Sequence, residues 1–163
     1  DRDIDVGHFP YNPDFPTYCS LDFGYRMPAA GWFQTNMVEG KWHINIIDEI
    51  IHQSNIKTDE LVKQVKSRPS IRDRVSTNIA SGVSHVRSFV ENANGERFIH
   101  LDHKCKGLAE DFENYRYPEH KEGTNLKPDP IKDGIHDHGM DMVRYFFINR
   151  FPIRNTKLRL EPR

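Results

Sequence analysis

Two short stretches place acidic side chains where a buried carboxylate could do chemistry. The first is 17–25, TYCSLDFGY, in which Asp22 follows an apolar run and precedes a glycine. A carboxylate in such a run is costly to bury unless it is paired, hydrogen-bonded or bound to a metal. Asp22 is therefore either a strand-end residue that caps its own turn or a metal ligand at the end of a first strand.

The second stretch is 136–145, HDHGMDMVRY, which has the pattern of a helix start. Asp137 and Asp141 are four residues apart, and His138 and Asp141 three apart, so all three share a helix face. Acids at a helix N-terminus are also favoured by the helix dipole alone. A zinc interpretation is weaker, because structural zinc takes four nitrogen or sulfur ligands.

A third group, His100, His103 and Cys105, could also suggest zinc. The end of a strand that runs into a loop explains these residues more simply.

The elements that must position these residues can be read from the hydrophobic pattern. Short connections between apolar runs at 17–24, 29–37 and 41–50 predict an antiparallel meander. Amphipathic spacing and the positions of proline and glycine then predict helices at about 58–68 and 76–91 and a strand at 97–101. A helix that ends before Pro118, a surface loop at 118–133 and a last helix from His136 to Pro152 follow.

The 163 residues fit one domain, and their net charge of −1 gives no global basic field. The mean hydropathy of −0.75 and the lack of a long apolar run predict no membrane span. We expect a proline-interrupted, irregular arm over 1–16 that continues an upstream linker, a domain over 17–152 and a basic tail over 153–163.

Together, the stretches LDFGY (21–25), IDEI (47–50) and DHGMDMVRY (137–145) resemble the nuclease domain of the large terminase subunit of tailed double-stranded DNA bacteriophages. The order of elements matches over nearly the whole chain. The resemblance implies a ribonuclease H-like α/β fold: a mixed sheet, made of the antiparallel three-strand meander plus a parallel strand or strands, flanked by helices. It also implies a metal-dependent endonuclease that cuts concatemeric viral DNA during genome packaging.

The same resemblance implies the site. Asp22 would bridge two Mg²⁺ or Mn²⁺ ions and Asp141 would hold one of them, with His138 and Asp137 as catalytic helpers. Two such ions, about 3.5–4 Å apart, activate water and stabilise the leaving oxygen in phosphodiester hydrolysis. Hard ions of this kind prefer carboxylate oxygen.

The chain departs from the family at one point. The family carries another essential Asp at the end of a parallel strand, but 70–77, SIRDRVST, has only two apolar residues in eight and cannot be a central strand. We hypothesise that a segment with this strand and acid is absent between Ser67 and Ile71. Asp73 is a poor substitute for the lost acid.

Local cations at Arg26, Arg72 and Arg74, with the basic tail, are candidates for DNA contact; the alternative for each is an ordinary solvated surface charge. The chain lacks a G-x-x-x-x-G-K-[ST] loop, so it would be the nuclease part alone. The family implies double-stranded DNA, the portal protein, the small terminase subunit and the terminase ATPase domain as partners, in the host cell cytoplasm.

Two alternatives remain from the sequence. One is another ribonuclease H-like DNA nuclease of the resolvase or transposase type. The other is a non-catalytic portal-docking module that retains a relic of the acidic site.

Overall fold

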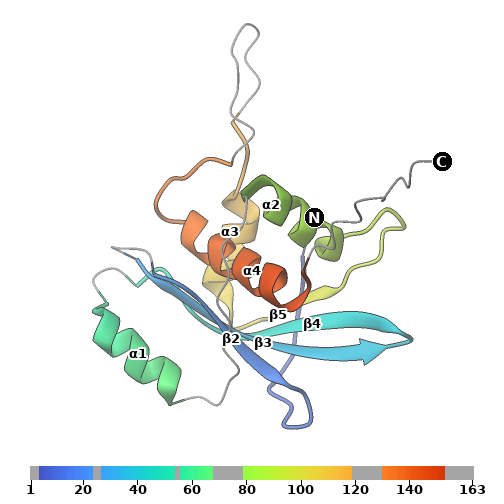
Figure 1. Cartoon of the computed structure of the whole chain (residues 1–163), viewed down its shortest axis with the longest axis horizontal. Coiled ribbons are helices and arrows are strands. Elements are labelled where there is room, and N and C mark those ends of the chain that lie inside the picture. Colours follow the sequence, from blue (N-terminus) through green and yellow to red (C-terminus); the bar gives the residue numbers. More distant parts are fainter. Residues whose placement is uncertain (1–3, 24–26, 54–55, 68–78, 119–129, 153–163) are drawn as a thin grey trace, which may run out of the picture.

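The computed structural model describes residues 4–23, 27–53, 56–67, 79–118 and 130–152. Its centre is one five-stranded sheet in the order β1-β5-β4-β3-β2 (Figure 1). The strands are β1 (Asp5–Gly7), β2 (Thr17–Asp22), β3 (Ala29–Val38), β4 (Lys41–Ile50) and β5 (Ile99–Asp102). The helices are α1 (Thr58–Lys66), α2 (Ile79–Val90), α3 (Lys106–Asn114) and α4 (Asp137–Arg150).

Strands β2, β3 and β4 form the predicted antiparallel meander. Glu39 and Gly40 close the tight β3–β4 turn with positive φ angles of 50° and 76°, a conformation that glycine adopts without steric cost. Strand β5 then runs parallel to β4, so the sheet is mixed. The predicted α/β fold of a meander plus parallel strands, flanked by helices, is confirmed.

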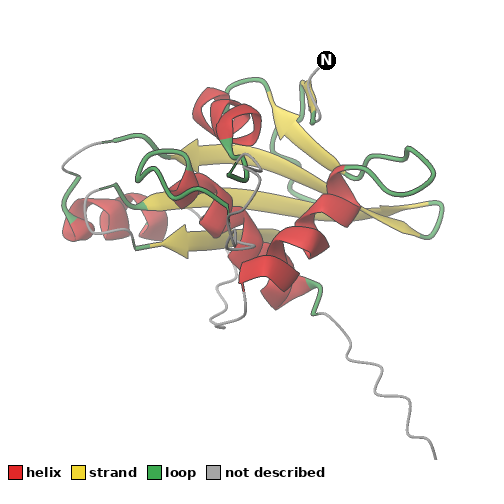
Figure 2. Ribbon diagram, turned by 90° about the horizontal axis from the view of Figure 1, so that it is seen from above, coloured by secondary structure: helices red, strands yellow, loops and turns green. Residues whose placement is uncertain are grey.

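Each face of the sheet has its own apolar core. Alternate side chains of the meander point to opposite faces, so Trp32 and Phe33 belong to different clusters. Helix α1 covers one face through Leu61 and Val65, whereas α2, α3 and α4 cover the other (Figure 1). Seen from above, helices lie in front of the strands on this side of the sheet (Figure 2).

The arm was expected to be irregular, but its residues Asp5–Gly7 form β1, which pairs in parallel with β5 at the sheet edge. Further along, buried Gln34 holds the arm, because its Oε1 accepts from Asn12 N at 2.9 Å and its Nε2 donates to Asn12 O at 2.7 Å. A three-residue strand has no period that sequence analysis can detect. The division into arm, domain and tail stays a prediction, and 153–163 lies outside the described residues.

Among the described strands, β2 is at one end of the strand order, and the parallel strand β5 pairs with β4. The segment 68–78, where we hypothesise a loss, lies outside the described residues. Among the described residues, no helix is both long and apolar enough to cross a membrane.

Helix α3 packs against the first turn of α4 through a glycine. Asp111 of α3 is fully buried, and its Oδ2 lies where a side chain at Gly139 would begin. Any Cβ at position 139 would overlap this carboxyl oxygen. The glycine of the 137–145 motif therefore lets α3 fix the start of α4.

We predict that Gly139→Ala destabilises the protein by about 1–3 kcal/mol, the usual cost of overpacking a tight contact. In an Asp111→Ala background the same change should be neutral or stabilising by up to about 1 kcal/mol, because alanine is the better helix former. A double-mutant cycle from urea unfolding measures both effects. Equal costs of Gly139→Ala in both backgrounds would contradict this packing argument.

Candidate active site

The carboxylate of Asp22 lies at the end of β2 and faces the first turn of α4. Nδ1 of His138 is 2.8 Å from Oδ2 of Asp22, so the imidazole N–H donates to the carboxylate. The two side chains are only 21% and 16% exposed. This charge-assisted hydrogen bond fixes the orientation of Asp22.

Three contacts hold α4 close to the sheet. Ser20 Oγ donates to the main-chain oxygen of Met142 at 2.7 Å. At Gly31 on β3, an added Cβ would lie 2.5 Å from Met142 Sδ, so the helix crosses where the sheet has no side chain. The rings of Phe33 and Phe146 stack with centroids 4.1 Å apart and complete the contact.

Asp141, one turn further along α4, is buried between two cations. Its Oδ1 accepts from Arg144 Nη2 at 2.9 Å, and its Oδ2 accepts from Lys132 Nζ at 2.7 Å. The same Lys132 Nζ lies 3.9 Å from Oδ2 of Asp137. The other oxygen of Asp137 accepts from Gly134 N at 2.8 Å, so this acid also closes the turn before the helix.

The electrostatics show that these acids act on one another. Burial raises the pKa of Asp22 above its ordinary value, the charge of Asp141 raises it further, and His138 and Lys132 oppose the rise. Partial burial lowers the pKa of Lys132, but its hydrogen bond and attraction to Asp141 outweigh this, and the net pKa is raised. His138 and Lys132 thus link the end of β2 to the three side chains at the start of α4, and the metal-binding and catalytic roles of these residues stay predictions.

The chemistry of this donor set fits a divalent cation. Asp22 and Asp141 offer carboxylate oxygens, and the ammonium of Lys132 already marks a position where positive charge is favoured. Mg²⁺ is commonly held by one or two protein carboxylates, with water and substrate phosphate as further ligands. Within the described chain, the three-residue group whose ligand atoms lie within 4.8 Å of one another is elsewhere, at His8, Asp102 and His103.

Other residues from the sequence analysis have different surroundings. Glu49, in the IDEI stretch, caps α3, because its carboxylate accepts from Gly107 N at 2.9 Å and Leu108 N at 2.8 Å. Cys105 is 1% exposed in the core, and burial raises the pKa of its thiol, which disfavours a metal-binding thiolate. The ring of His100 is held by Asp5 and His43, at 2.7 and 2.8 Å. His100, His103 and Cys105 therefore do not form one zinc site.

The candidate DNA-contacting residues Arg26, Arg72 and Arg74, and the substitute acid Asp73, lie outside the described residues. Lys132 could not be predicted from the sequence, because it lies in a polar, proline-containing stretch with no periodic signal. The role of Arg144 was also missed, although the residue is part of the quoted motif.

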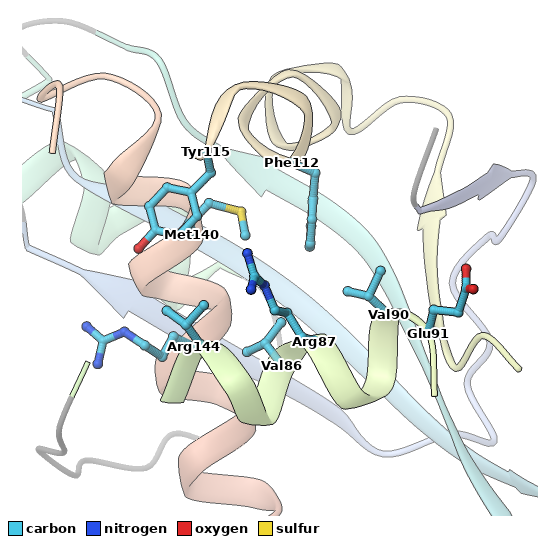
Figure 3. A pocket seen from close by; sticks show the side chains of 9 residues that line it. Val86, Arg87, Val90, Glu91, Phe112, Tyr115, Met140 and Arg144 are labelled. Atoms are coloured by element: carbon cyan, nitrogen blue, oxygen red, sulfur yellow. The ribbon is translucent and has the colours of Figure 1, made fainter. Parts of the chain in front are cut away.

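A pocket of about 380 Å³ lies between α2, α3 and α4, beside this site (Figure 3). Val86, Phe112 and Met140 give it an apolar lining. Arg144 lines one side, and its guanidinium also holds Asp141.

A second buried cluster supports the start of α4. Asp111 Oδ1 is 2.7 Å from His52 Nε2, while Oδ2 has no hydrogen-bond partner among the described residues. Burial, followed by the charge of Glu49, raises the pKa of Asp111 to about 9. Burial also lowers the pKa of His52. Both shifts favour the uncharged forms of the pair, a protonated carboxyl that donates to a neutral imidazole.

Two solved structures resemble this fold. The nuclease domain of g2p, the large terminase of bacteriophage SPP1 with bound Mn, has a TM-score of 0.58 at 20% identity, over 89% of this chain and 95% of that chain. The P22 large terminase nuclease domain has a TM-score of 0.59 at 15% identity, over 89% and 86%. No protein-family model and no curated protein sequence matches this chain. The chain thus has the fold of large terminase nuclease domains.

The raised pKa of Asp111 predicts a pH-dependent stability. Between the ordinary value of 3.8 and about 9, the folded carboxyl keeps a proton that the unfolded one has lost. The contribution of this protonated carboxyl to the free energy of unfolding is complete below about pH 4 and is lost as the pH rises towards 9. The asparagine side chain of the Asp111→Asn variant stays uncharged at every pH in this range. We therefore expect the midpoint of thermal unfolding to fall less with pH in the variant than in the wild type. Parallel pH profiles of the two proteins would contradict the assignment.

Lys132 should compete with a metal ion for Asp141. We predict that Lys132→Gln binds Mn²⁺ up to about fivefold more tightly by calorimetry, since a half-exposed ion pair contributes about 0.2–1 kcal/mol. The variant should also unfold at a lower temperature in EDTA, because the acids lose their cation. Lys106→Gln, an exposed change on α3, is the matched control. Weaker Mn²⁺ binding in Lys132→Gln would show that the lysine assists the metal.

Proposed function

We propose that this chain is a metal-dependent endonuclease domain that cleaves double-stranded viral DNA during genome packaging. The observation that carries the proposal is that Asp22 on β2 and Asp141 on α4 lie near enough for the charge of Asp141 to raise the pKa of Asp22, and that each is bonded by a basic side chain. The fold shared with the nuclease domains of the SPP1 and P22 large terminases supports it.

Asp22 and Asp141 would hold the divalent ions, Mg²⁺ or Mn²⁺, with two per site in our proposal. Bound there, the ions would supply an activated water and stabilise the leaving oxygen of the phosphodiester. The SPP1 domain is described with bound Mn, which supports the choice of metal.

The protein residues around the acids would position them. His138 holds Asp22 in one orientation through its 2.8 Å hydrogen bond. Arg144 does the same for Asp141, and Asp137 fixes the turn that leads into α4. Lys132 keeps positive charge against Asp141 and Asp137, and in our proposal it contacts a phosphate of the substrate.

Substrate binding should depend on partners. With a net charge of −1, the isolated domain would bind DNA weakly and in a salt-sensitive way, with Arg26, Arg72 and Arg74 as contacts. We propose that the terminase ATPase domain, the portal protein and the small terminase subunit deliver DNA to it in the host cell cytoplasm. Low intrinsic affinity would then limit unscheduled cutting.

Cleavage of supercoiled plasmid with Mn²⁺ tests the function. We expect Asp22→Asn and Asp141→Asn to fall to background, while Asp14→Asn, an exposed change on the arm, cleaves like wild type. His138→Ala should lose about 10–100-fold, as is usual for residues that orient metal ligands.

Unchanged plasmid cleavage by the Asp22→Asn variant would contradict the proposed function. If the wild type neither cleaves nor shows Asp22-dependent Mn²⁺ binding, the docking-module alternative is favoured. Selective cutting of branched DNA would instead favour the resolvase type.

A further inference from the structure

A second cluster of metal-binding side chains lies where the two parallel edge strands end. The pairing of β1 with β5 places Gly7 opposite Asp102. His8 and His103 each follow their strand by one residue, and His103 N donates to Gly7 O at 2.8 Å. Two histidines that are far apart in the sequence therefore flank one carboxylate.

The spacing of the ligand atoms suits a small metal ion. One ligand atom each from His8, Asp102 and His103 lies within 4.8 Å of the other two. Nδ1 of His103 is 3.5 Å from Oδ1 of Asp102, longer than the N–H···O hydrogen bonds of about 2.7–3.2 Å. Two ligands about 2.0–2.1 Å from a tetrahedral zinc ion are separated by about 3.3–3.4 Å.

The carboxylate of this cluster is held in place before any ion arrives. Asp102 is 2% exposed. Its Oδ2 accepts from Phe9 N at 2.8 Å and its Oδ1 accepts from Lys104 N at 3.1 Å. Hydrogen bonds of this kind orient carboxylates that ligate metals, and they leave further lone pairs free.

The two imidazoles are available to an ion. Both side chains are exposed, and no described residue makes a hydrogen bond to either ring. The centroids of their rings lie 5.5 Å apart at an interplanar angle of 39°, so the rings converge without stacking face to face.

We propose that His8, Asp102 and His103 bind one first-row transition-metal ion, with zinc as the physiological candidate. Two imidazole nitrogens and one carboxylate oxygen form a ligand set typical of Zn²⁺, with a fourth position open to water. The all-carboxylate pair at Asp22 and Asp141 suits Mg²⁺ or Mn²⁺ instead. In this proposal, the C-terminal ends of the parallel strands therefore carry two sites that select different metal ions.

The ion would cross-link the arm to the sheet. Strand β1 is only three residues long and pairs with a single neighbour, so its attachment is short. An ion bound by His8 together with Asp102 and His103 at the end of β5 would hold β1 in register with β5. This role does not depend on nuclease activity.

Calorimetric titration with Zn²⁺ tests the site. We expect wild type to bind one ion here, and His8→Ala and His103→Ala each to lose at least about tenfold in affinity. Lys104→Ala, an exposed change in the same turn, and Asp22→Asn, at the other site, should retain this binding. Zinc at about a hundred times Kd should raise the thermal midpoint of wild type by roughly 5–10 °C, and that of His103→Ala much less.

Unchanged zinc affinity in both histidine variants would overturn the proposal, and Asp102 would then serve only to cap its turn. Loss of all zinc binding in Asp22→Asn would also overturn it. Two zinc ions, one lost in Asp22→Asn and the other in His103→Ala, would support two separate sites.

Discussion

Helix α4 lies so close to the sheet that the strands beneath it carry a glycine and a serine at the crossing. Gly31 leaves room for Met142, and Ser20 uses its hydroxyl to bond the helix main chain. This contact sets the distance between the end of β2 and the first turn of α4. It thereby concentrates negative charge in a partly buried volume, and that charge is costly without compensation. His138, Lys132 and Arg144 supply the compensation.

The acidic side chains near the C-terminal ends of the strands differ in the hydrogen-bond donors that bind them. Strands β2, β4 and β5 run in the same direction, so their C-terminal ends lie on the same side of the sheet. Glu49 is taken up by main-chain N–H groups of α3, and Asp102 by those of Phe9 and Lys104. Asp22 is bonded by a side chain, that of His138. Glu49 therefore serves as a helix cap, whereas Asp22 is oriented by a side chain of α4, and the main-chain bonds of Asp102 leave it further lone pairs for an ion.

Much of the fold could be predicted because it follows from local patterns. The meander, the four helices and β5 were placed within a few residues by apolar periodicity, turns and prolines. Strand β1 was missed because three residues carry no period and their partner lies near residue 100. Lys132 was missed for a related reason: a lone lysine in a polar stretch has no local signature, and only its contact with Asp141 gives it a role.

The sequence by itself determined which residues could carry the chemistry. Asp22 stands out because a carboxylate at the end of an apolar run needs a partner, and Asp137, His138 and Asp141 because helical spacing sets them on one face. The tertiary structure alone decided that these two stretches meet, which cations neutralise Asp141, and that His8 and His103 flank Asp102. Those outcomes depend on contacts between residues far apart in the chain. Spacing along a sequence encodes the geometry of a single helix or strand, but not the packing of one element against another.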